Sequence, residues 1–264
     1  MVDAAEPAIL DLSGEVIELL TEIELDPSLT ELTLMHCRLQ QIDSLLPLTR
    51  LEKLNLRANR IREVQGLQNC VLLRELELYE NQITQLSGLD GLARLELLDV
   101  SFNELTRIDG LQGLVALREL YLANNKIGAI EGLHGLPALR LLELGSNRLR
   151  AIKLDHLSSL EELHLGRNKL TQLDGLQALA KLRVLGVVSH RGGVGLRPGD
   201  MRLQHLLLTT SPLTTAVYSP LLAHYLPGEQ PSALLDGGRV AAPAKGAVRG
   251  PQRAREHGAA RRTH

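Results

Sequence analysis

The feature that most constrains this chain is a set of six asparagines at nearly equal intervals. They are Asn59, Asn81, Asn103, Asn125, Asn147 and Asn168, so the intervals are 22, 22, 22, 22 and 21 residues. A leucine stands eight residues before every one of them. A fixed interval of this length is typical of a solenoid, in which each unit buries its apolar side against its neighbours.

Each unit follows the pattern L-x-x-L-x-L-x-x-N-x-[IL], as in "LRELELYENQI" over residues 73–83. The second and third leucines alternate with period two, which predicts a short strand whose leucines face the same side. The chain must then turn and return within the same unit. This is the pattern of a leucine-rich repeat. We therefore predict an α/β fold: a leucine-rich-repeat solenoid with a curved parallel β-sheet on the concave side and short helical or 3-10 turns on the convex side.

The asparagines are predicted to be structural. A sharp turn after each strand leaves backbone N–H and C=O groups without strand partners, and such groups are costly to bury unpaired. An asparagine amide both donates and accepts hydrogen bonds, so it can satisfy these groups. We expect the six amides to be buried as a ladder between successive units.

The repeat divides the chain into three regions. Residues 1–28 are expected to form an N-terminal cap with a helix over 13–25, and residues 29–188 an array of about seven repeats with the next one incomplete. Residues 189–264 show no repeat, hold 7 of the 11 prolines and are predicted to be a disordered, basic Pro/Gly-rich tail. Within this tail, residues 203–228 have the length of a membrane span, but their three prolines and six Ser/Thr argue against one, so no membrane association is expected.

Charge and cysteine content indicate a setting for the chain. Residues 1–188 contain 19 Lys/Arg and 27 Asp/Glu, whereas residues 189–264 contain 10 and 4. For the basic tail, a solvated segment is favoured over a nucleic-acid-binding arm. Only Cys37 and Cys70 are present and no secretory signal is recognisable, which together indicate a reducing compartment.

The residue between the two strand leucines is expected to point outward on the concave side in every unit. These positions form one predicted column: Thr33, Asn55, Glu77, Asp99, Tyr121, Glu143 and His164. A column of carboxylates with a tyrosine suits protein binding, because tyrosine anchors contacts at low entropic cost and carboxylates steer a partner. A solvated face is the alternative. The candidate partner-binding residues are Glu77, Asp99, Tyr121, Glu143 and His164.

Catalysis is not expected. The sequence offers no nucleophile beside a base and no glycine-rich phosphate loop. Asp99, Glu143 and His164 are too widely spaced and too open for a metal site, so neither a metal nor another cofactor is expected. The acidity of the column also argues against nucleic acid on this face.

Several consecutive phrases carry a family resemblance. They are "LRELELYENQI" (73–83), "LELLDVSFNEL" (95–105), "LRELYLANNKI" (117–127), "LRLLELGSNRLRAI" (139–152) and "LEELHLGRNKLTQL" (160–173). In this order they resemble the leucine-rich-repeat regulatory subunit 7 family of protein phosphatase 1. The resemblance covers about residues 30–187 and is more specific than the general consensus.

The resemblance implies that the concave face holds the phosphatase catalytic subunit and modulates its activity or maturation. It places Asp99 and Glu143 at acidic contact positions and Tyr121 at an aromatic one, whereas His164 stands where the family has an aromatic residue. It also implies a nuclear and cytoplasmic location. The chain itself is expected to be monomeric.

Two other interpretations stay open at this stage. One is a general leucine-rich-repeat scaffold or adaptor that uses the same face for other proteins. The other is a shortened product that binds the phosphatase weakly, because the family continues through further repeats and a C-terminal cap.

Overall fold

The computed structural model describes residues 7–154, 156–171, 173, 176 and 178–187. The predictions for residues 189–264, including the apolar stretch 203–228, lie outside these residues. Nine three-residue strands and one 3-10 helix, η1 (Leu20–Glu22), occur in the described part. The strands are β1 (Ile9–Asp11), β2 (Glu31–Thr33), β3 (Lys53–Asn55), β4 (Glu75–Glu77), β5 (Leu97–Asp99), β6 (Glu119–Tyr121), β7 (Leu141–Glu143), β8 (Glu162–His164) and β9 (Val184–Gly186).

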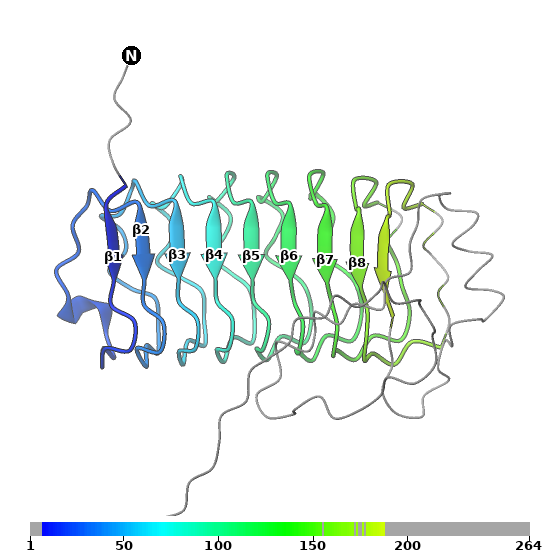
Figure 1. The fold of residues 1–264 in the computed structure, drawn as a ribbon, viewed down its shortest axis with the longest axis horizontal. Helices are drawn as coiled ribbons and strands as arrows, with labels where there is room; N and C mark the ends of the chain where they lie inside the picture. Colours follow the sequence, from blue (N-terminus) through cyan, green and yellow to red (C-terminus); the bar gives the residue numbers. More distant parts are fainter. Residues whose placement is uncertain (1–6, 155, 172, 174–175, 177, 188–264) are drawn as a thin grey trace, which may run out of the picture. The chain divides into compact units, whose positions relative to one another are not determined.

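All nine strands form one parallel sheet in which spatial order equals chain order, as Figure 1 shows. Each strand pairs with the equivalent residues of the next repeat, for example Leu54 with Leu76. The shorter repeat does not disturb this register, since Leu142 pairs with Leu163 across an interval of 21 residues. The missing residue is therefore absorbed outside the sheet.

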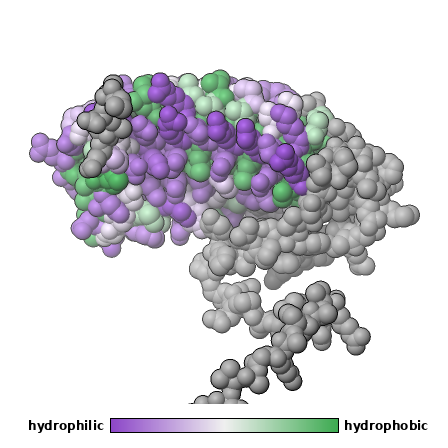
Figure 2. All heavy atoms as spheres, turned by 45° about the horizontal axis from the view of Figure 1, so that its top comes forward, coloured by the Kyte–Doolittle hydropathy of each residue, from purple (hydrophilic) through white to green (hydrophobic). Residues whose placement is uncertain are grey.

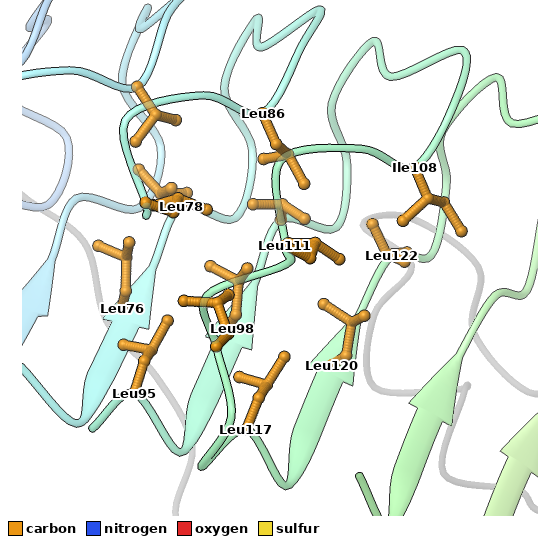
Figure 3. Close-up of a cluster of buried hydrophobic side chains, with 14 of the residues drawn as sticks. Leu76, Leu78, Leu86, Leu95, Leu98, Ile108, Leu111, Leu117, Leu120 and Leu122 are labelled. Carbon is orange, nitrogen blue, oxygen red and sulfur yellow. The ribbon is translucent and has the colours of Figure 1, made fainter. Parts of the chain in front are cut away.

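The leucines form one continuous core between the sheet and the returning limbs. Leu76, Leu98 and Leu120 point from successive strands into this interior, and Leu111 reaches it from a returning limb (Figure 3). All four side chains are fully buried. Each repeat thus buries its apolar side against its two neighbours.

The asparagine ladder is confirmed. In the repeat of Asn125, the side-chain Nδ2 donates to the carbonyl oxygens of Val100 (3.0 Å) and Leu122 (3.1 Å), while Oδ1 accepts the N–H of Leu105 (2.9 Å). One amide therefore joins its own turn to the turn of the preceding repeat. The same bonds recur for the other members, of which only Asn168 is half-buried rather than buried: Asn59, Asn81, Asn103, Asn147 and Asn168.

The first rung corrects a prediction. The helix expected over residues 13–25 is wrong: β1 pairs in parallel with β2, and the only helical residues there are those of η1. Leu10, Leu12, Ile17 and Leu20 stand 22 residues before Leu32, Leu34, Leu39 and Ile42, so this segment is itself a repeat. Its signal is weaker because Glu15 occupies the asparagine position.

The convex limb consists mainly of turns. In the limb after β4, Leu92 N–H donates to Leu89 C=O (2.9 Å) and Leu95 N–H to Leu92 C=O (3.0 Å), two successive bonds of 3-10 type. The expected short 3-10 segments are thus present as single turns, and the described limbs contain almost no helix. Gly88 enters this limb at φ +69°, and a Cβ there would lie 2.8 Å from the carbonyl oxygen of Val64.

Candidate functional site

The predicted outward column exists. Thr33 pairs with Asn55, Glu77 with Asp99, Tyr121 with Glu143, and the intervening pairs complete the series through His164 to Gly186. Adjacent members lie on neighbouring strands roughly 4.8 Å apart. We call this set the central column: Thr33, Asn55, Glu77, Asp99, Tyr121, Glu143 and His164. All five predicted partner-binding residues belong to it, on consecutive strands from β4 to β8.

Two further columns flank it because side chains alternate along a strand. The first column holds the residue two positions earlier: Glu31, Lys53, Glu75, Leu97, Glu119, Leu141, Glu162 and Val184. The third column holds the residue two positions later: Met35, Arg57, Tyr79, Ser101, Ala123, Gly145 and Gly166. Backbone hydrogen bonds between neighbouring repeats continue beyond the strands, beside the third column, for example from Phe102 N–H to Ala123 C=O (2.8 Å).

The N-terminal half of the face carries a cluster of charge and aromatic rings. The Arg57 guanidinium lies 4.6 Å from the centre of the Tyr79 ring and its Nη1 lies 3.2 Å from Glu77 Oε2. Tyr79 in turn packs on Phe102, with ring centres 4.8 Å apart. Arg57, Tyr79 and Phe102 therefore contact one another in series across three rungs, with the two rings tilted by 48° and each side chain partly exposed.

The middle of the face is acidic and partly buried. Asp99 Oδ1 accepts the N–H of Ser101 (2.9 Å), and the Tyr121 hydroxyl donates to Glu119 Oε2 (2.8 Å). Burial raises the pKa of Asp99, against the opposing effects of the Ser101 hydrogen bonds and the charge of Arg57. Hydrogen bonds thus fix the side chains of Asp99 and Tyr121 in the chain without a partner.

Glu143 and His164 are two enclosed members of the central column, and they face each other on neighbouring strands. Their side chains are 13% and 17% exposed, with Glu143 Oε2 4.0 Å from His164 Nδ1. Burial raises the pKa of Glu143 to about 7, although Glu143 Oε1 accepts the N–H of Gly145 at 2.6 Å. Burial also lowers the pKa of His164, opposed by Glu162, whose Oε2 lies 3.8 Å from Nε2.

Sequence reasoning missed two properties of this face. The third column becomes small and buried after Tyr79, from Ser101 to Gly166, which leaves room for the Asp99 and Glu143 carboxylates to accept the N–H groups of Ser101 and Gly145. The first column places Leu97 and Leu141 on either side of Glu119. Both properties could have been found by writing out the positions two residues before and after each central residue.

Three further observations on the described residues concern metal binding, thiol chemistry and membrane spanning. Over these residues, no group of three or more His, Cys, Asp or Glu side chains could hold a metal ion. The two thiols are buried, and burial raises the pKa of Cys70 to about 11. The described part also holds no helix that is both long and apolar enough to cross a bilayer. On the face presented in Figure 2, hydrophilic side chains cover most of the described surface around separate hydrophobic patches.

Comparison with known proteins agrees with this architecture. A family described as "Leucine Rich repeats (2 copies)" matches residues 27–69 and 115–159, and one described as "Leucine rich repeat" matches residues 49–105. The described array has the leucine-rich-repeat fold. No protein of curated function matches the sequence closely.

Solved leucine-rich-repeat structures have the same fold. An internalin (inlF) from Listeria monocytogenes is 28% identical with a TM-score of 0.55, over 61% of this chain and 48% of the internalin. Internalin C2 (inlC2) from the same organism is 26% identical with a TM-score of 0.53, over 62% and 74%. TLR13 in its complex with ssRNA13 is 26% identical with a TM-score of 0.52, over 64% and 30%. The chain thus spans about half the length of the first structure.

Proposed function

We propose that the concave face binds a folded protein through the central column. The observation that carries this proposal is the unbroken series from Glu77 to His164, five consecutive rungs whose polar side chains share one direction. A solenoid presents such a series as one extended surface, which suits recognition of a large partner. Pre-ordered side chains reduce the entropy lost on binding.

Charge defines the partner. Together with Arg57, the first and central columns contain seven carboxylates and two cations. The carboxylates are Glu31, Glu75, Glu77, Asp99, Glu119, Glu143 and Glu162, and the cations are Lys53 and Arg57. A complementary partner surface is basic, and it meets an aromatic anchor at Tyr121. Tyrosine and arginine are enriched among the residues that dominate interface energies.

We propose further that this partner is the catalytic subunit of protein phosphatase 1 and that binding modulates its activity or maturation. The support is the series of phrases over residues 73–173, which resembles the phosphatase regulatory family unit by unit. A nuclear and cytoplasmic location follows from the same proposal. In this assignment Asp99, Tyr121 and Glu143 contact the phosphatase, with Glu77 and His164 at the two ends.

A general scaffold or adaptor is the second candidate. The observation that favours it is the breadth of the matches, since the matching repeat families are general ones and the solved neighbours are an internalin pair and TLR13. The central column serves the same purpose in this case, with a different basic partner.

Binding of purified phosphatase catalytic subunit to the full chain tests the proposal. Asp99, Tyr121 and Glu143 are changed together to alanine. Because an anchor side chain contributes about 1–4 kcal/mol, the triple variant should lose at least a hundredfold in affinity. The matched control changes three exposed convex residues, Arg94, Gln112 and Glu131, and should keep the wild-type affinity.

The outcomes separate the two candidates. Tight wild-type binding that the triple variant loses supports the phosphatase assignment. If the triple variant binds the phosphatase as tightly as wild type does, the central column is not the binding surface. If the wild-type chain does not bind the phosphatase although circular dichroism shows that it is folded, the phosphatase assignment is wrong. The general scaffold is then the remaining candidate.

A further inference from the structure

The turns that follow β7 and β8 carry a second charged surface of opposite sign. Residues 145–154 and 166–171 contain five Lys/Arg and no Asp or Glu. We call four of these residues the turn-edge patch: Arg148, Arg150, Arg167 and Lys169. All four side chains are exposed, and none forms an ion pair within the part of the chain that the structure describes.

Backbone hydrogen bonds hold the patch together. Arg148 N–H donates to Ile127 C=O and Lys169 N–H to Leu149 C=O, both at 2.9 Å, so Arg148 and Lys169 occupy equivalent places on neighbouring rungs. Such places lie roughly 5 Å apart. Leu149 between Arg148 and Arg150 is fully buried, which leaves both arginines on the outside of the same turn.

The equivalent turns nearer the N-terminus do not share this property. There each turn contains at least one carboxylate, and Lys126 Nζ lies 2.9 Å from Glu104 Oε2. Arg60 and Arg62 occupy the places that Arg148 and Arg150 take four repeats later, but Glu63 and Glu80 stand on the same and the next turn. The turn after β3 (residues 57–66) also has a positive net charge, but Glu63 lies within it and Arg57 Nη1 lies 3.2 Å from Glu77 Oε2. Among the equivalent ten-residue turns that the structure describes, residues 145–154 are the turn that holds cations and no Asp or Glu.

We propose that the turn-edge patch binds an acidic peptide segment of a protein partner, separately from the central column. Arginine guanidinium groups pair with carboxylates through two parallel hydrogen bonds, and three of the four members are arginines. The neighbouring exposed residues are small, namely Gly128, Ala129 and Ala151, so an extended peptide can approach the arginine side chains.

Two features favour a short acidic peptide over a nucleic acid. Binding of single strands relies on aromatic side chains that stack with bases, and the two turns contain no Phe, Tyr or Trp. The patch also covers only two rungs, and the acidic concave columns adjoin it, so a long polyanion following the solenoid would meet repulsion.

Fluorescence anisotropy of a labelled ten-residue oligoglutamate with the full chain tests this site. Wild type should bind the peptide, and binding should weaken as salt is raised, because exposed charges are screened. The R148E/K169E variant should lose at least tenfold in affinity. The control variant R60E/R62E, which reverses two cations in a single turn four repeats earlier, should change the affinity less than twofold. D99A/Y121A/E143A should bind the peptide as wild type does, which separates this site from the central column.

Three results would overturn the inference. They are equal loss in R148E/K169E and R60E/R62E, retention of wild-type affinity in R148E/K169E, or tighter binding of a twenty-residue oligothymidylate that R148E/K169E abolishes. The last result would assign the patch to nucleic acid. R148Q/K169Q serves as a second variant if charge reversal lowers the melting temperature, and it should show the same loss in smaller degree.

Discussion

At the scale of single residues, one amide per repeat connects the turns. Asn125→Ala leaves the N–H of Leu105 and the carbonyl groups of Val100 and Leu122 without their partner in a buried place. Each unsatisfied buried group costs about 1–3 kcal/mol, so we expect a loss of roughly 3 kcal/mol or more in urea unfolding. Asn69→Ala is the control, since this exposed amide makes a single bond to Leu46 C=O, and it should cost less than about 1 kcal/mol. Equal losses would contradict the ladder.

Glu143 makes stability depend on pH. Its pKa is raised from 4.5 to about 7 in the folded chain, so between these values the folded state binds more protons than the unfolded state. Stability from this group is therefore full below pH 4.5 and falls as pH rises towards 7, by up to a few kcal/mol at about 1.4 kcal/mol per pKa unit. The raised pKa of Asp99 likewise makes stability fall as pH rises. The pKa of His164 is lowered, so below pH 6.5 its contribution to stability rises with pH. Urea unfolding of Glu143→Gln between pH 5 and 8 should lack most of this decline, and an unchanged decline would assign it elsewhere.

The residue before each asparagine has a left-handed backbone although it is not glycine. Glu80 is exposed and has φ 58°. This conformation costs an ordinary residue about 1–2 kcal/mol, whereas glycine adopts it freely but loses about 0.5–1 kcal/mol more entropy on folding. We expect Glu80→Gly to be as stable as Glu80→Ala or up to about 1 kcal/mol more stable. Thermal unfolding of the two variants decides this, and a clear loss for glycine would contradict the φ value.

At the scale of elements, a glycine turn sets the spacing between rungs. Gly88→Ala would place a Cβ 2.8 Å from Val64 C=O at φ +69°, so a loss of about 2 kcal/mol or more is expected. Gly128→Ala is the matched control, because a Cβ there meets nothing within 4 Å, and it should be neutral or stabilising by up to about 1 kcal/mol. Differential scanning calorimetry compares them, and equal melting temperatures would argue against a close approach at Gly88.

Elements show why the sequence predicts most of the fold but not its beginning. The 22-residue interval and the period-two leucines were enough to predict the strands, their parallel order and the central column. The first rung was missed because its apolar spacing, Ile17, Leu20 and Ile23, also suits one face of a helix. Residues three apart mark both a helix and a repeat limb, and only the match to Leu39 and Ile42 distinguishes the two.

The contacts of the site were less predictable than its positions. Phe102 reaches Tyr79 because its backbone is left-handed, at φ 56°, which redirects the side chain across the rung. The same angle recurs before every asparagine of the array, but position 102 is the one of these six that holds an aromatic ring, so the contact with Tyr79 depends on the residue type and not on the repeat. The burial of Glu143 likewise depends on neighbouring rungs, since His164 lies 21 residues away.

At the scale of the whole array, function follows from repeating one unit with varied surface residues. The buried leucines and asparagines are nearly constant, while the outward positions vary from Thr33 to His164. Each repeat contacts mainly its neighbours, so stability is spread along the array and surface changes have local effects. This separation allows one face to be acidic and the turns after β7 and β8 to be basic without loss of the fold.

Site-directed photo-crosslinking tests the central claim most directly. A photo-reactive amino acid is placed at Tyr121 in the central column or, as the control, at the exposed convex residue Val115. Each full chain is mixed with the phosphatase catalytic subunit and irradiated. We predict a crosslinked product from position 121 and none from position 115. Crosslinking from position 115 alone would contradict recognition through the concave face.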